Sequence, residues 1–177
     1  MGHAQMMGRA TGPTESQLAL AEPAHPPSSQ APLMWALSAL LSWVIPVIAQ
    51  VVWWAVYARP LWPHLVVAAA TAALMVLHIA VVPLWRYRVH RWEISPQAVF
   101  TRTGWFVQER RIAPISRVQT VDTFRGPLDR LFGLANVTVT TASSAGAVHI
   151  EALDSDVADR VVAQLTDIAA LRGEDAT

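Results

Sequence analysis

Hydrophobic positions are continuous in the first half of the chain and broken into short runs in the second. Residues 33–57 and 65–85 form apolar stretches of 25 and 21 residues without a formal charge. At a rise of ~1.5 Å per residue, each can cross the ~30 Å hydrocarbon core of a bilayer as a helix. The seven residues between them, 58–64, allow only an antiparallel connection. The pattern therefore predicts a transmembrane hairpin, 33–85.

The few polar groups in these stretches are expected to bond across the hairpin. Pro46 should kink the first helix, and Gln50 needs an interhelical partner. His78 is the one ionisable side chain in either stretch. We expect a neutral, hydrogen-bonded histidine with Gln50, Thr71 or a serine as partner, and a proton or ion pathway is the alternative. Aromatic rings favour the headgroup level, which predicts interfacial anchors at Trp53, Trp54, Trp62 and Trp85.

The segments outside the hairpin predict one small domain between disordered ends. Residues 1–32 hold five prolines and no sustained periodicity, and residues 173–177 follow the last periodic segment. Beyond residue 86, runs rich in Val, Ile, Thr and aromatic residues indicate strands at 87–94, 97–103, 105–112, 116–123, 135–142 and 146–152. In the last two, alternation places Val137 and Val139 on one face and Val148 and Ile150 on one face, which predicts a hairpin over a core.

The last periodic segment predicts a helix that covers the sheet. From residue 156 to 171 the apolar residues recur at helical spacing, with Val157, Val161 and Leu165 on one face. Asp154 or Ser155 can cap its first turn. Residues 86–172 should thus form an α+β domain, an antiparallel sheet capped by a C-terminal helix.

Charge is distributed unevenly, although the formal net charge is zero. Residues 86–130 carry nine arginines against four acidic residues, and residues 131–177 carry two against seven. Three arginines lie within six residues after the second apolar stretch, compared with Arg59 alone in the loop. By the positive-inside rule the domain and both termini face the cytoplasm, and a periplasmic or surface-exposed domain is the alternative.

The basic residues next to the second stretch can contact anionic lipid headgroups, at ~1 kcal/mol for each arginine near the surface. A topology signal without recognition is the alternative. The acidic C-terminal half would repel nucleic acid, which we exclude as a partner. The candidate headgroup residues are Arg86, Arg88, Arg91, Arg110 and Arg111.

Two segments of the domain resemble a known family. After YRVHRWEISPQAVFTRTG, the stretch RRIAPISRVQTVDTFRGPLDRLFGLANVTVTTA at residues 110–142 is similar to the YdbS-like bacterial pleckstrin-homology (PH) family of membrane proteins. The resemblance implies a PH-like fold, a strongly bent antiparallel sheet capped by the last helix, without known catalysis. It also implies a larger relative with several such domains as partner, and envelope or secretion-related roles. The turn 94–97 lacks the cation typical of phosphoinositide-binding relatives.

No pattern in the chain indicates catalysis or a cofactor. Cysteine is absent, and there is no nucleophile elbow, phosphate loop or dinucleotide fingerprint. Asp154, Asp156 and Asp159 are better explained as residues of a helix start than as a metal site. We expect a non-enzymatic membrane protein whose domain is a protein-interaction or assembly module, able to form homo-oligomers. An anionic-lipid sensor and an accessory subunit of a channel or transporter are the alternatives.

Overall fold

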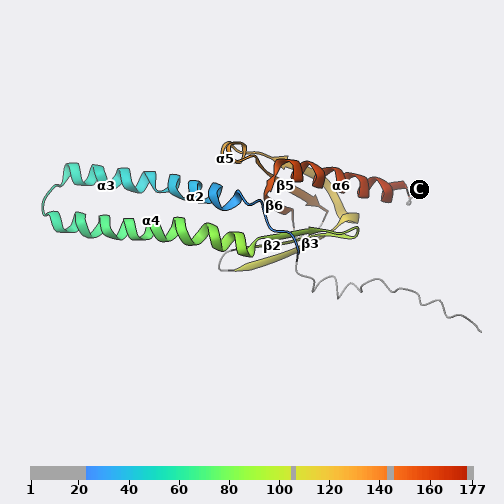
Figure 1. Ribbon diagram of the computed structural model, residues 1–177, viewed down its shortest axis with the longest axis horizontal. Helices are drawn as coiled ribbons and strands as arrows, with labels where there is room; N and C mark the ends of the chain where they lie inside the picture. The colour runs from blue at the N-terminus through green and yellow to red at the C-terminus, as the bar shows by residue number, and fades with distance from the viewer. Residues whose placement is uncertain (1–22, 105–106, 143–145, 175–177) are drawn as a thin grey trace, which may run out of the picture.

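The computed structural model describes residues 23–104, 107–142 and 146–174 of the chain. An elongated helical hairpin forms one end of the molecule and a β-rich domain forms the other (Figure 1). The hairpin consists of α2 (Ala31–Ser42), α3 (Val44–Val56) and α4 (Leu61–Val89). Its apolar side chains are exposed over most of its length, which leaves lipid as their natural solvent.

The first of the two candidate spans is interrupted at one residue, Trp43, which separates α2 from α3. The predicted kink is therefore present, but it lies three residues before Pro46. Proline has no N–H to donate to the carbonyl of Ser42, four residues earlier, and its ring crowds that carbonyl. The helix consequently breaks on the N-terminal side of the proline.

Both spans are longer than the apolar stretches that predicted them. They cover Ala31–Val56 and Leu61–Val89, so the connection is residues 57–60 instead of 58–64. The helical end of α4 also corrects the strand predicted at 87–94, which begins only at Arg91. Arginine is a good helix former, so the helix continues after the apolar run ends.

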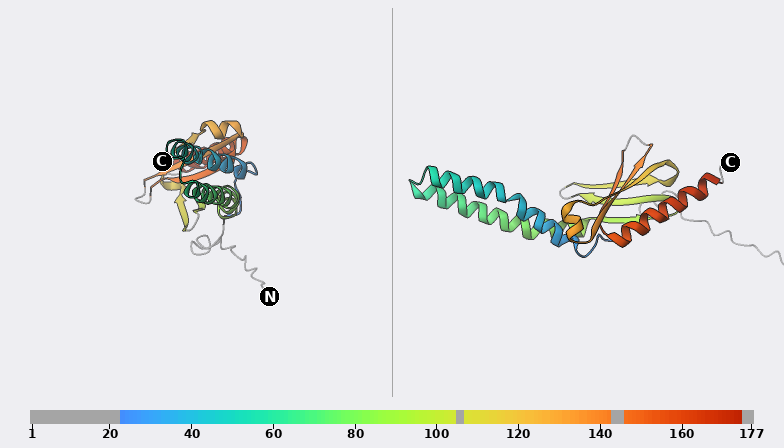
Figure 2. Two further views of the ribbon diagram at one scale, coloured as in Figure 1. Left: turned by 90° about the vertical axis from the view of Figure 1, so that its left-hand side faces the viewer. Right: turned by 90° about the horizontal axis from the view of Figure 1, so that it is seen from above.

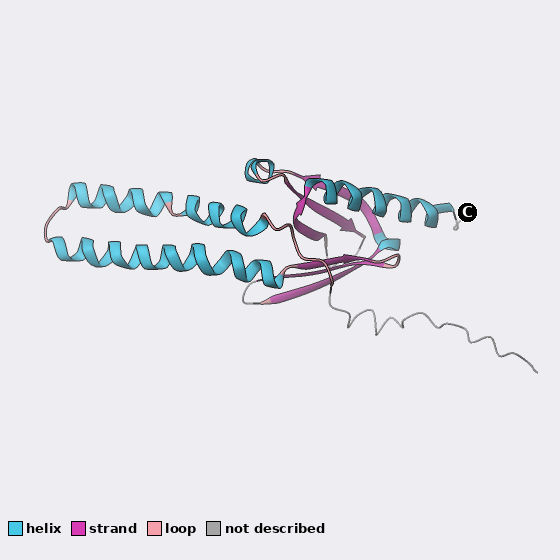
Figure 3. Ribbon diagram, viewed as in Figure 1, coloured by secondary structure: helices cyan, strands magenta, loops and turns pink. Residues whose placement is uncertain are grey.

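All six predicted strands are present, but they form two sheets instead of one bent sheet (Figure 3). The strand order is β1-β2-β3 in one sheet and β4-β5-β6 in the other, antiparallel throughout. A short 3-10 turn, η1 (Ile115–Arg117), separates them. The strands are β1 (Arg91–Ile94), β2 (Ala98–Gly104), β3 (Gln108–Pro114), β4 (Val118–Phe124), β5 (Leu134–Thr141) and β6 (Val148–Asp154).

The main core lies between the sheets and the C-terminal helix α6 (Ser155–Glu174). Alternate residues of β5 and β6 are buried, including Val137, Val139 and Ile150, as the sequence pattern predicted. Leu165 closes the core from α6. One short helix, α5 (Pro127–Leu131), precedes β5 and lies at the end of the domain nearest α2 (Figure 1).

The segment before α2 is a strap across the domain, which corrects the prediction of disorder for residues 23–32. The strap, residues 23–30, pairs with β1 through a bridge between His25 and Trp92. The N–H of Ser28 donates to the carbonyl of Ala152 at 2.8 Å, and its hydroxyl donates to Asp154 at 2.5 Å. Asp154 thus binds the strap, and Ser155 donates to the Gly133 carbonyl.

The structure describes the two ends of the chain only in part. Residues 1–22 of the predicted tail lie outside the described residues, as do residues 175–177 at the C-terminus. The helix α6 extends to Glu174, beyond the predicted domain end at residue 172. The sequence pattern had no signal for the strap, because its hydrogen bonds join backbone groups of residues 24–28 to residues of β1 and β6 that lie far away in the sequence.

Candidate functional site at the membrane junction

The hairpin is attached to the domain through a second apolar cluster, which we call the junction cluster. Trp35 of α2 is only 6% exposed, and it packs with Met34 against Leu134 of β5 and Ala152 of β6. Parts of α4 and α5 complete the cluster. Its other members are Ala31, Tyr87, Leu128 and Phe132.

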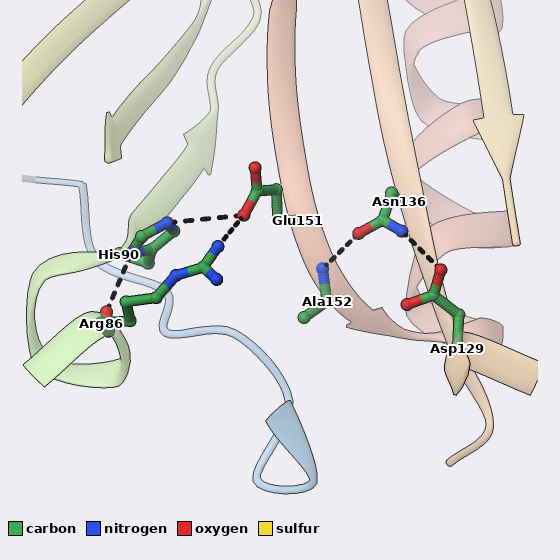
Figure 4. A network of polar contacts seen from close by, with 6 residues as sticks. All are labelled: Arg86, His90, Asp129, Asn136, Glu151 and Ala152. Carbon is green, nitrogen blue, oxygen red and sulfur yellow. Dashed lines mark hydrogen bonds and ion pairs between the residues drawn. The ribbon is translucent and has the colours of Figure 1, made fainter. Parts of the chain in front are cut away.

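Arg86 connects the end of α4 to this cluster. Its guanidinium lies 4.3 Å from the centre of the Trp35 ring and donates to Glu151 of β6 at 2.7 Å. His90 approaches the same carboxylate oxygen, with its Nε2 3.5 Å from Oε2 of Glu151 and its Nδ1 2.9 Å from the Arg86 carbonyl (Figure 4). Since a carbonyl can only accept, Nδ1 is the donor in this bond. Arg86 therefore links α4 both to β6, through Glu151, and to the junction cluster, through Trp35.

Glu151, the partner of Arg86, lies in a β-bulge. Between the pairs Ala135–Leu153 and Val137–Ile150, one residue of β5, Asn136, faces two residues of β6, Glu151 and Ala152. Ala152 has a φ of +54°, in the left-handed region, which is unusual for a residue with a Cβ. Successive side chains of a regular strand point to opposite faces, whereas at this bulge two consecutive residues are both buried, Ala152 in the junction cluster and Leu153 in the main core.

The Asn136 side chain holds the bulge in place (Figure 4). Its Oδ1 accepts from the Ala152 N–H at 2.8 Å, and its Nδ2 donates to Asp129 of α5 at 2.9 Å. Asp129 also accepts from the N–H of Gly126 at the start of α5. Sequence analysis missed this network. The one available signal was an asparagine among the Val and Thr residues of β5.

The arginines of the first sheet, β1-β2-β3, lie on both of its faces. Arg91, Arg102 and Arg110 lie opposite one another on β1, β2 and β3, and side chains paired in this way point to the same face. We call this set the arginine row. Arg111 lies on the other face, where it contacts Glu109 and the Ala147 carbonyl.

The arginine row lies next to the membrane helix. Arg91 follows α4 by two residues and donates to the carbonyls of Tyr87 and His90. Arg102 was missed by sequence analysis and donates to the Val89 carbonyl. Its alignment with Arg91 depends on strand register, which no local pattern encodes. Arg88, on the last turn of α4, is exposed and makes no ion pair among the described residues.

Within the hairpin, the polar side chains bond between helices. Gln50 donates to Thr71, as expected. The expected bond of His78 across the hairpin is also present, but the partner is wrong: the indole of Trp43 donates to its Nδ1 at 3.1 Å. Trp43 was overlooked because its donor is carried by an otherwise apolar ring. Among the predicted anchors, Trp53 packs against His64 with the two rings tilted, and the others are exposed: Trp54, Trp62 and Trp85.

Known proteins match this chain in both the hairpin and the PH-like domain. The sequence model of the Bacterial PH domain family matches residues 26–169, from the strap through the hairpin into α6. The chain belongs to this family. It is also 33% identical over 117 residues to the UPF0699 transmembrane protein YdbS of Bacillus subtilis (strain 168), covering 66% of this chain and 72% of the relative. No solved structure matches the chain.

The chain is thus a membrane protein with a two-helix hairpin and a PH-like domain. The family match includes the hairpin as well as the domain. Among the described residues, no group of three His, Cys, Asp or Glu side chains is close enough to hold a metal ion.

The junction should weaken in acid. Hydrogen bonding to His90 and the charge of Arg86 keep the pKa of Glu151 below its ordinary 4.5, although partial burial acts in the opposite direction. A depressed pKa stabilises the fold fully above the unfolded pKa, and this contribution is lost as the pH falls through the folded value. The Glu151 side chain is 38% exposed, so water screens the pair.

We therefore expect Glu151→Gln to lower stability by about 0.5–1 kcal/mol at neutral pH. The difference from the wild type should shrink as the pH falls below 4.5. Thermal unfolding of the full chain in detergent, repeated over this pH range, measures it. A difference that stays constant down to about pH 3 would contradict the assignment.

Proposed function

We propose that the protein is a non-enzymatic membrane protein that holds its PH-like domain in one orientation at the bilayer, as a protein-interaction or assembly module. The observation that carries this proposal is the combination of strap and junction. Arg86 binds β6 from the end of α4, and Ser28 binds β6 from the segment before α2. A domain fixed at both ends of the hairpin presents the same surface to every partner.

The surface best suited to a partner is the open edge of β3. The strap contacts β1 and β6, whereas β3 pairs only with β2 among the described strands. Ile112 on β3 is 47% exposed, and a hollow of about 370 Å³ lies beside it. An unpaired edge offers backbone donors and acceptors to an added strand. We propose a second copy or a larger PH-like relative as partner, in envelope or secretion-related processes.

Orientation follows the distribution of arginine. We propose a bacterial inner-membrane location in which both termini and the domain are cytoplasmic and the 57–60 connection faces outward. Support comes from the three arginines close after residue 85, against Arg59 in the connection. Anionic lipids of the cytoplasmic leaflet would then lie beside the domain.

A specific observation also favours the second candidate function, sensing of anionic lipid. The arginine row places three cations side by side on one face of the first sheet. Its position next to the end of α4 suits lipid phosphate. The exposed Arg88 adds a further cation close to the same level.

A crosslinking experiment tests the interaction module. We expect a photo-crosslinking amino acid at Ile112, in the full chain in native membranes, to capture a discrete partner that is a second copy or a PH-domain relative. The same amino acid at Gln164, exposed on α6, is the matched control. If position 112 gives no more product than position 164, the β3 edge is not the interaction surface.

Native mass spectrometry of the full chain tests the lipid sensor. Arg110→Gln should weaken phosphatidylglycerol binding by about fivefold, the equivalent of ~1 kcal/mol for one arginine near the surface. Arg160→Gln removes an equal charge from α6, where Arg160 pairs with Asp156, and should leave binding unchanged. Equal effects of both variants, or equal binding of phosphatidylcholine, would rule out recognition by the row.

A further inference from the structure

The depth of the domain in the membrane is set by Arg86. The two spans contain 26 and 29 residues. These correspond to ~39 and ~44 Å, more than the ~30 Å hydrocarbon core requires. An arginine is costly within hydrocarbon, so the core ends close to Arg86 on α4. Because Arg86 lies over the Trp35 ring, Trp35 marks the same level on α2.

The short helix α5 lies at that level. Its Leu128 and the following Phe132 pack on the junction cluster together with Trp35. The helix α5 lies beside the first turns of α2, at the end of the domain that faces the hairpin (Figure 1, and the right-hand view of Figure 2). The helix α5 is therefore at headgroup depth, although it belongs to the domain.

Two large apolar side chains at α5 do not pack inside the protein. Leu131 is 69% exposed and Phe124, at the end of β4, is 65% exposed. Arg130 lies beside them, in a shallow hollow of about 530 Å³ that is also lined by Arg125. Arg125 pairs with Asp159 at 2.9 Å, whereas Arg130 makes no ion pair among the described residues.

The conformation of α5 is fixed independently of any lipid. Pro127 occupies the first turn, where its missing N–H has no cost. Asp129 accepts from Gly126 and from Asn136, which itself binds the bulge in β6. Rotation of Leu131 into the core would break this network, so the side chain remains directed outward.

We propose that α5 is an interfacial anchor, a second contact of the protein with the bilayer besides the hairpin. Leu131 and Phe124 enter the boundary between headgroups and acyl chains, and Arg130 binds the phosphate of an anionic lipid beside them. This combination of apolar side chains and a neighbouring cation is how peripheral helices bind a membrane surface. The proposal concerns the bilayer alone, so it is independent of the partner at β3.

Depth measurements by spin labelling test this anchor. The chain has no cysteine, so Leu131→Cys and Gln164→Cys each provide a single labelling site in the full protein. In nanodiscs containing phosphatidylglycerol, we expect the label at 131 to be accessible to oxygen and protected from a water-soluble nickel complex. The label at 164 should show the reverse, because α6 extends away from the hairpin (Figure 1).

The cation is tested by a charge-matched pair of variants in the Leu131→Cys background. Arg130→Gln should raise the nickel accessibility of the label. Arg117→Gln, in the turn between the two sheets, should not change it. The proposal is overturned if the label at 131 is as accessible to nickel as the label at 164, or if the two arginine variants have the same effect.

Discussion

The cost of placing a charge in hydrocarbon determines how deep this protein lies in its membrane. Two apolar helices cross, and the first cation along the second one, Arg86 in its last turn, defines where the crossing ends. Arg86 does not simply extend into the headgroups. It lies over Trp35 and binds Glu151, so the residue that fixes membrane depth also fixes the domain. The domain is consequently attached at one level, without an intervening linker.

Several contacts of different kinds depend on that attachment. The strap adds backbone bonds to both sheets, and the β-bulge at Ala152 gives neighbouring residues of β6 two separate roles. The strap lies along the edges of β1 and β6, whereas β3 has β2 as its one strand partner among the described strands. A PH-like fold is here combined with the membrane anchor as one folded unit, and this is consistent with a family match that includes the hairpin.

Sequence analysis predicted the parts whose signals are local. Charge-free length predicted the hairpin, and alternation in β5 and β6 predicted the core positions that are buried. The strap, the bulge and the arginine row depend on contacts between segments far apart in the sequence. Arg102 is an example, since only strand register places it between Arg91 and Arg110. The two-sheet division was missed because a bend at residues 115–117 resembles an ordinary turn in sequence.

Labelling of single cysteines in intact bacterial cells tests the central claim most directly, that the hairpin crosses the membrane and holds the domain on its inner side. Arg59→Cys, in the connection between the spans, should react with a membrane-impermeant maleimide in intact cells. Gln164→Cys in α6 should react only after the cells are permeabilised. Labelling of Gln164→Cys in intact cells, or protection of Arg59→Cys until permeabilisation, would contradict the account.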